Sequence, residues 1–228
     1  TVSQPTAAMG EAMFRCAVGD DTLGDDPTVK ELEDYGNILT GKEASLFLTS
    51  GTMANQAAIG ALTQRGDEVI VGNTSHILNL EAGGAAALFG IQLRPVDTSR
   101  GRYPLDALEE ACQEPGIQRA RTSLLCLENS CDLNRGWLVP QEDIEQACHW
   151  AKQRGLAVYL DGARIFNAAA AANTTVEALA APVDCLMFAL TKGISAPFGA
   201  MLCGSREFVA KARWVRQRLG GGMRQAGF

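Results

Sequence analysis

Residues 45–63, SLFLTSGTMANQAAIGALT, contain the pattern that decides the fold class. The apolar run at 45–50 predicts a strand, and the small and apolar residues at 53–63 predict a helix. Gly51 lies at the turn between them, where its lack of a side chain lets another group approach the backbone closely. A strand that runs directly into a helix is typical of α/β proteins.

The same alternation continues along the chain. Apolar runs predict six further strands, at 68–72, 92–96, 123–128, 156–160, 185–190 and 198–203. Helical patterns lie at 105–112, 142–154 and 207–219. Continuous apolar strands separated by amphipathic helices predict a three-layer α/β fold with a mostly parallel, seven-stranded sheet. The last strand follows a turn that is too short for a helical crossover, so we expect it to be antiparallel.

Length and composition are those of an ordinary globular domain. The chain has 228 residues, 46% of them hydrophobic and 20% charged, which suits one large domain with an ample core. The formal net charge is −6 and the basic residues are scattered, so we expect no nucleic-acid partner. No apolar run reaches the roughly 18 residues of a membrane span. No leader opens the chain, so we expect neither a membrane partner nor secretion.

Cysteine and histidine usage narrows the location and the chemistry. The seven cysteines are odd in number and irregularly spaced, which indicates reduced thiols in a cytoplasmic protein rather than a disulfide framework. The two histidines, His76 and His149, are too few and too far apart to predict a metal site.

The turn at Ser50, Gly51 and Thr52 is a candidate anion site. Free backbone N–H groups and the positive end of the helix dipole meet at such a strand-to-helix junction, and the two hydroxyls add donors. The alternative is an ordinary N-capped helix.

Asp161 ends a second apolar strand, in the stretch LAVYLDGAR. Ligands of open α/β sheets bind at the carboxyl ends of the strands, so this carboxylate is placed to bind one. The alternative is an aspartate that caps the next helix.

Lys192 follows a third apolar strand, in the stretch CLMFALTKG. A lysine beside a glycine at a strand end suits Schiff-base chemistry. The alternative is a lysine whose amine reaches the surface while its stem packs on apolar groups.

The order of these three features favours one cofactor. A phosphate loop, a strand-end Asp161 and a strand-end Lys192 follow the order found in pyridoxal-phosphate enzymes of the aspartate-aminotransferase fold. The carboxylate would pair with the pyridinium nitrogen, and the lysine would form the Schiff base. His76 adds a ring that could stack on the cofactor, unless it serves only at a helix cap.

Nine short stretches carry a family likeness. They are TVSQPTAAM (1–9), VGDDTLGDDPT (18–28), LTSGTMAN (48–55), SHI (75–77), EAGGAA (81–86), LEN (127–129), DGAR (161–164), TKGISAPFG (191–199) and GGGMRQAG (220–227). On these motifs the chain resembles the low-specificity L-threonine aldolases, in the β-eliminating lyase group of fold-type I pyridoxal-phosphate enzymes. The likeness runs along nearly the whole chain, and the last two stretches are highly specific.

The resemblance implies roles for the matching residues. Lys192 would be the cofactor lysine, Asp161 the pyridinium partner, His76 the stacking ring, and Gly51 and Thr52 phosphate ligands. Arg164 would bind the cofactor or the substrate carboxylate, and Arg224 would line the substrate side, across a subunit contact. A homotetramer with active sites at dimer interfaces is implied as well, so we expect a homo-oligomer.

Four positions depart from the family pattern. Leu23 and Leu80 stand where the family has tyrosines, Cys131 where it has a histidine, and Gln217 where it has a lysine. Cys131 could act as an acid or base only with a suitable pKa. The small C-terminal domain and the opening residues of the family are also missing. We therefore expect residues 1–228 to be the cofactor-binding large domain, as a fragment of a longer protein.

The activity implied is cleavage of a β-hydroxy-α-amino acid, such as L-threonine or allo-threonine, to glycine and an aldehyde. Lys192, His76 and Cys131 are the candidate catalytic residues. The altered positions keep two alternatives open. One is another pyridoxal-phosphate reaction on a small amino acid, by a lyase, racemase or transaminase. The other is a non-catalytic fragment or degenerate paralogue.

Overall fold

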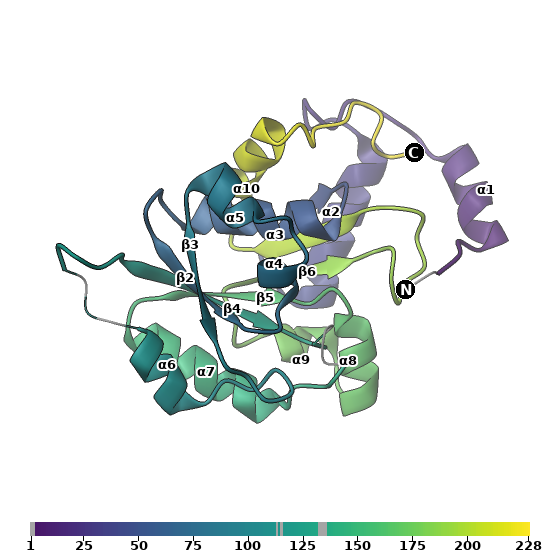
Figure 1. The fold of residues 1–228 in the computed structure, drawn as a ribbon. Coiled ribbons are helices and arrows are strands. Elements are labelled where there is room, and N and C mark those ends of the chain that lie inside the picture. Colours follow the sequence, from purple (N-terminus) through teal and green to yellow (C-terminus); the bar gives the residue numbers. More distant parts are fainter. Residues whose placement is uncertain (1–2, 113, 115, 132–135) are drawn as a thin grey trace.

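The computed structural model describes residues 3–112, 114, 116–131 and 136–228. Within them, seven strands form one sheet in the order β1-β7-β6-β5-β4-β2-β3 (Figure 1). The strands are β1 Ala44–Leu48, β2 Glu68–Gly72, β3 Gln92–Val96, β4 Thr122–Glu128, β5 Ala157–Asp161, β6 Cys185–Ala189 and β7 Ala200–Gly204. All seven predicted strands are found, and the mostly parallel α/β fold is confirmed.

Strand β7 runs against its neighbours. It pairs antiparallel with both β1 and β6, whereas the other neighbouring strands pair in parallel. The antiparallel prediction for this strand is therefore confirmed. Because β4, β5 and β6 are parallel, their carboxyl ends meet at one edge of the sheet, which is where α/β proteins bind ligands.

Ten helices surround the sheet in the part of the chain that the structure describes. The four predicted helices are α3 Gly51–Leu62, α6 Leu105–Ala111, α7 Gln141–Gln153 and α10 Arg206–Arg218. The others are α1 Ala7–Arg15, α2 Pro27–Thr40, α4 His76–Asn79, α5 Gly84–Phe89, α8 Ile165–Ala172 and α9 Val176–Ala180. Several of these are short or rich in alanine, so their sequences show little contrast between an apolar and a polar face.

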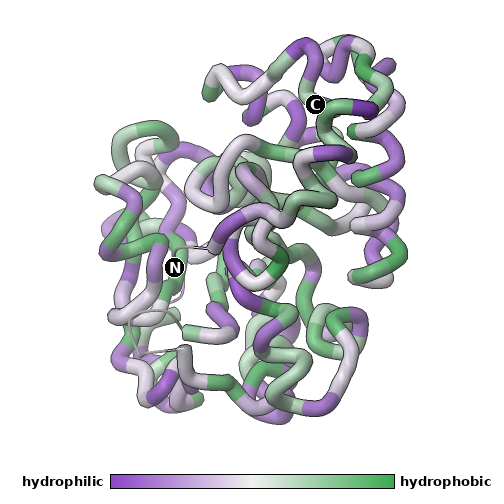
Figure 2. The backbone as a smooth tube through the Cα atoms, turned by 90° about the vertical axis from the view of Figure 1, so that its right-hand side faces the viewer, coloured by the Kyte–Doolittle hydropathy of each residue, from purple (hydrophilic) through white to green (hydrophobic). Residues whose placement is uncertain are grey.

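Two hydrophobic cores cover the two faces of the sheet. Successive residues of a strand point to opposite faces, so Leu125 and Leu127 of β4 join one core while Leu124 and Cys126 join the other. Helices α6, α7, α8 and α9 pack on the first face, and α3, α5 and α10 on the second (Figure 1). Helix α2 adds Val29 to the first core. Hydrophilic and hydrophobic stretches are interspersed along the backbone (Figure 2). Burial on both faces explains why the strands inside the sheet are mostly apolar, whereas the edge strand β3 is only partly buried.

The segment before α2 is joined to α10 and to the segment after it. Asp21 and Arg216 are both buried and form an ion pair at 2.8 Å. The backbone N–H of Asp21 donates to the carbonyl of Arg224 at 2.8 Å, and that of Gly227 donates to Asp26 Oδ2 at 3.0 Å. Helix α1, by contrast, has no buried residue. Among the described helices, none combines the length and apolar character that a membrane span requires.

Candidate active site

A pocket opens at the carboxyl edge of the sheet. It is lined by Ser50–Thr52 at the start of α3, His76 at the start of α4, Asp161 at the end of β5, Arg164 just before α8, and Lys192 after β6. The structure thus brings together seven of the residues that the sequence singled out.

The start of α3 presents unused donors to this pocket. Ser50 caps the helix, because its Oγ accepts the N–H of Met53 at 3.1 Å and its carbonyl accepts that of Ala54 at 3.0 Å. The N–H groups of Gly51 and Thr52 precede the first helical hydrogen bonds, so a ligand can take them. A Cβ on Gly51 would come within 2.8 Å of Met187 Cε on the pocket wall. The ordinary N-capped helix, which was the alternative to an anion site, is therefore present. This cap still leaves two N–H donors for an anion.

Asp161 is buried at the bottom of the pocket. Its Oδ1 accepts the N–H of Ala163 at 3.1 Å, and its Oδ2 accepts a hydrogen bond from Asn55 Nδ2 at 2.8 Å. Burial raises the pKa of Asp161 above its ordinary value, against the effect of these hydrogen bonds. A cationic ligand group beside the carboxylate would offset the cost of keeping its charge buried.

His76 is fixed by two carboxylates. Its backbone N–H donates to Glu128 Oε2 at 2.8 Å, and its Nδ1 lies 2.9 Å from Glu81 Oε1. The hydrogen bond to Glu81 raises the pKa of His76, and the charge of Asp161 adds to this, whereas burial and the charge of Lys192 lower it. The ring is therefore held in place and biased toward its protonated form.

Lys192 lies in a tight turn beyond β6. Its carbonyl accepts the N–H of Ser195 at 3.1 Å, and Ser195 adopts a left-handed conformation with φ of 65°. A Cβ on Gly193 would lie 2.3 Å from Asn167 Oδ1, so glycine lets this turn pack against α8. The lysine is half-buried and its side chain lines the pocket.

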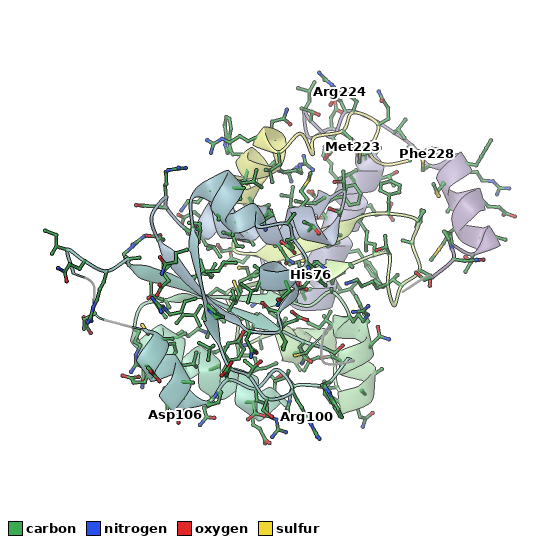
Figure 3. The ribbon with its side chains drawn as sticks, viewed as in Figure 1. His76, Arg100, Asp106, Met223, Arg224 and Phe228 are labelled. Carbon is green, nitrogen blue, oxygen red and sulfur yellow. The ribbon has the colours of Figure 1, made fainter. Side chains whose placement is uncertain are left out.

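Two predicted site residues lie elsewhere. Cys131 is buried outside this pocket, where its Sγ donates to the carbonyl of Glu128 at 3.3 Å. Burial raises the pKa of this thiol to about 12, which does not suit an acid or base near neutral pH. Arg224 forms an ion pair with Asp20 on the surface, and Figure 3 shows it well away from His76. Neither residue lines the pocket with Lys192 within this chain. This is contrary to expectation for Cys131, whereas a role of Arg224 across a subunit contact stays a prediction.

The other three departures from the family pattern also lie outside the pocket lining. Leu23 and Leu80 are exposed, at 74% and 52% of their surface, and Gln217 is exposed on α10. An exposed leucine at such a position has no group that could exchange a proton with a substrate.

The sequence did not single out three polar residues of the site, Asn55, Glu81 and Glu128. Asn55, from the second turn of α3, donates through Nδ2 to Glu81 Oε1 at 2.6 Å as well as to Asp161. Glu128 lines the pocket wall at the end of β4. The polar pair Asn55-Gln56 inside an otherwise apolar helix is the feature of the sequence that could have indicated them. Side-chain nitrogen and oxygen atoms of His76, Glu81 and Asp161 lie within 4.8 Å of one another, so these side chains form one polar cluster beside the pocket.

Comparisons with known proteins show which family the chain is similar to. The sequence profile of the family Beta-eliminating lyase matches residues 1–228. The low specificity L-threonine aldolase of Escherichia coli (strain K12) is 44% identical, with 100% of this chain and 68% of the relative covered. Alanine racemase TOXG of Cochliobolus carbonum is 33% identical over 99% of this chain and 58% of its own length.

A solved structure shows the same fold. The threonine aldolase of Leishmania major matches with a TM-score of 0.84 at 20% identity, covering 96% of this chain and 64% of that one. The chain therefore spans less than two thirds of the racemase and of the Leishmania protein. The resemblance inferred from the motifs is confirmed at the level of the family. This chain, with its seven-stranded sheet and its pocket at the strand ends, belongs to the beta-eliminating lyase family.

Proposed function

We propose that this protein binds pyridoxal phosphate in the pocket and cleaves a β-hydroxy-α-amino acid, of the threonine or allo-threonine type, to glycine and an aldehyde. The observation that carries the proposal is the presence of Lys192, Asp161 and the start of α3 around one pocket. Residues 1–228 would form the cofactor-binding large domain. The E. coli relative, named as a low specificity L-threonine aldolase, supports the substrate class.

The groups around the pocket fit the cofactor part by part. The free N–H groups of Gly51 and Thr52 and the hydroxyl of Ser50 would bind the phosphate. Asp161, a buried carboxylate, would pair with the pyridinium nitrogen, whose charge would offset the cost of keeping the carboxylate ionised. Lys192 would bind the aldehyde carbon through Nζ.

The remaining chemistry is proton transfer and orientation by the protein. Pyridoxal phosphate, when bound, supplies an electron sink for the electron pair of the breaking Cα–Cβ bond. His76 would cover the ring face, and its Nε2 is the ring nitrogen left to exchange the β-hydroxyl proton, because Nδ1 faces Glu81. Arg164 would bind the substrate carboxylate, which sets the bond that is cleaved. The Lys192 amine would then return a proton to Cα as glycine forms.

A second reaction on the same cofactor is racemisation of a small amino acid. The observation that favours it is the relative named as an alanine racemase, which aligns with 99% of this chain. Cys131, Leu23 and Leu80 all lie outside the pocket lining, so these altered positions do not decide between the two reactions.

Assembly and location are part of the proposal. We infer a homo-oligomer, a dimer or tetramer, in the cytoplasm. The family likeness and the seven unpaired cysteines support this. Light scattering of the purified protein would test the assembly, and a monomer at micromolar concentration would contradict it.

The function is tested with purified protein loaded with pyridoxal phosphate. Aldehyde should form from L-threonine, L-allo-threonine or phenylserine, with glycine in equal amount, and Lys192→Ala should abolish it. Formation of D-alanine from L-alanine without any aldehyde would instead support the racemase. If the cofactor binds and neither product forms, the proposed activity is wrong; if the cofactor does not bind, the proposal as a whole is wrong.

A further inference from the structure

Glu81 is a buried carboxylate beside the pocket with hydrogen-bond partners on both of its oxygens. Its Oε1 accepts from Asn55 Nδ2 at 2.6 Å and contacts His76 Nδ1 at 2.9 Å. Its Oε2 accepts from Gln56 Nε2 at 2.6 Å. The side chain has no exposed surface. Because a buried carboxylate is costly unless it is fully hydrogen-bonded, three partners in one place indicate a position under strong constraint.

The loop around Glu81 is built to hold it there. Ala82 and Gly83 both adopt left-handed conformations, with φ of 52° and 70°. A Cβ on Gly84 would lie 2.8 Å from Gln56 Cδ, so only glycine lets the loop approach α3 this closely. A left-handed alanine costs free energy, which the hydrogen bonds of Glu81 help to offset.

Asn55 joins Glu81 to Asp161. Its Nδ2 donates one hydrogen to Glu81 and the other to Asp161 Oδ2 at 2.8 Å. Its Oδ1 accepts the hydroxyl of buried Tyr159 at 2.5 Å, which fixes which way the amide faces. All of the amide's hydrogens are therefore used, and two buried carboxylates share one donor group.

The contact with His76 fixes its tautomer. A carboxylate oxygen can only accept, so Nδ1 must carry the proton of the contact. In neutral His76 the other nitrogen, Nε2, is then unprotonated and can accept a proton. The backbone of His76 is held as well, because its N–H donates to Glu128 Oε2 at 2.8 Å.

We propose that Glu81 is a positioning residue, which orients the His76 ring and keeps the proton on Nδ1 while Asn55 ties the same carboxylate to Asp161. The expected effect on catalysis rests on the proposed function. The effect on His76 itself does not, so the two are measured separately.

The first test uses the cofactor-free protein. His76 and His149 are the only histidines, so ¹⁵N-labelled imidazole signals are few, and His149→Gln assigns them. In the unaltered protein, neutral His76 should carry its proton on Nδ1. The pKa of His76 should lie above the ordinary 6.5 and fall toward it in Glu81→Gln. Protonation at Nε2 in the neutral form would overturn the proposal without any variant.

A matched control separates the effect of Glu81 on the pKa of His76 from a general effect of removing a buried carboxylate. Glu68 is also buried and pairs with Arg94 at 2.6 Å, but it lies at the opposite end of β2 from the pocket. Glu68→Gln should leave the His76 titration unchanged. Equal shifts in Glu81→Gln and Glu68→Gln would also overturn the proposal, as would no shift in either.

The second test uses the loaded enzyme. Glu81→Gln should still bind pyridoxal phosphate at Lys192, with its absorbance band, while kcat falls about ten-fold and KM changes less than about two-fold. Glu68→Gln should keep kcat within about two-fold. An unchanged kcat in Glu81→Gln would contradict the claim that the orientation of His76 by Glu81 affects catalysis. Failure of the unaltered protein to take up the cofactor would contradict the proposed function and leave the histidine measurements valid.

Discussion

Asp161 and Lys192 reach the same pocket from neighbouring parallel strands, Asp161 as the last residue of β5 and Lys192 three residues beyond the end of β6. The register pairs Asp161 with Met187, so the chain after β6 extends past the carboxylate before it turns. The glycine at 193 and the left-handed Ser195 then keep the lysine at the strand end. The sheet thus places a buried anion and an amine around one ligand site.

Gly51→Ala should weaken binding of pyridoxal phosphate about ten-fold with little loss of stability. The new Cβ would press on Met187 Cε, the flexible end of a side chain, at the place where we propose the phosphate binds. Titration of the cofactor by absorbance and thermal unfolding would measure the two effects. Gly10→Ala, in exposed α1 with nothing within 4 Å, is the control and should change neither binding nor the fold. Unchanged affinity in Gly51→Ala would contradict the phosphate assignment.

The contribution of His76 to stability should depend on pH. Because the folded pKa of His76 is raised above 6.5, its pairing with Glu81 stabilises the fold fully below about 6.5 and is lost as the pH rises through the folded value. The Tm difference between the unaltered cofactor-free protein and His76→Gln should therefore shrink with rising pH. His149→Gln, at an exposed position, should show no such trend. A difference that grows with pH would have the wrong sign.

Gly101→Ala should destabilise the fold by about 2–5 kcal/mol, from left-handed strain and overpacking together. Gly101 has φ of 79°, and a Cβ there would lie 1.9 Å from Cys131 Sγ. Gly24→Ala isolates the strain, since Gly24 has φ of 73° and open space around it. That variant should cost only about 1–2 kcal/mol. Equal losses in denaturant unfolding would show that the Cys131 contact is absent.

Cys131 should resist alkylation in the folded protein. Its thiol is buried and its pKa is raised to about 12, whereas Cys16 is partly exposed. Iodoacetamide at pH 8 followed by peptide mapping should therefore label Cys16 well before Cys131. Faster labelling of Cys131 would contradict its buried placement and restore it as a candidate acid or base.

Much of the fold could be predicted because buried strands consist mostly of apolar residues, which the sequence shows directly. Both faces of the sheet are covered, so the strands inside it are mostly apolar, and the short turn before β7 required an antiparallel strand. The edge strand β3 is only partly buried. Helices such as α8, with its run of alanines, show little difference between a polar and an apolar face, so the sequence did not predict them. Helix α2 begins with the cap Asp26 followed by Pro27, and this pair is the feature of the sequence that indicates its start.

The site was predictable where backbone geometry sets the position. Strand ends and a helix start place Asp161, Lys192 and Gly51 with no need for side-chain detail. Glu81 and Asn55 were missed because their roles depend on long-range contacts between a loop and α3 that no local pattern contains. Arg224 has its contact within this chain with Asp20, and its role across a subunit contact, expected from the motif, stays a prediction.

The most direct test of the central claim is to locate the lysine that binds the cofactor. The chain has five lysines, Lys30, Lys42, Lys152, Lys192 and Lys211. Borohydride reduction of the protein loaded with pyridoxal phosphate, followed by peptide mass mapping, should place one phosphopyridoxyl group on Lys192 and none on Lys192→Ala. A label on any of the other four lysines at one equivalent, or no label at all, would contradict the account.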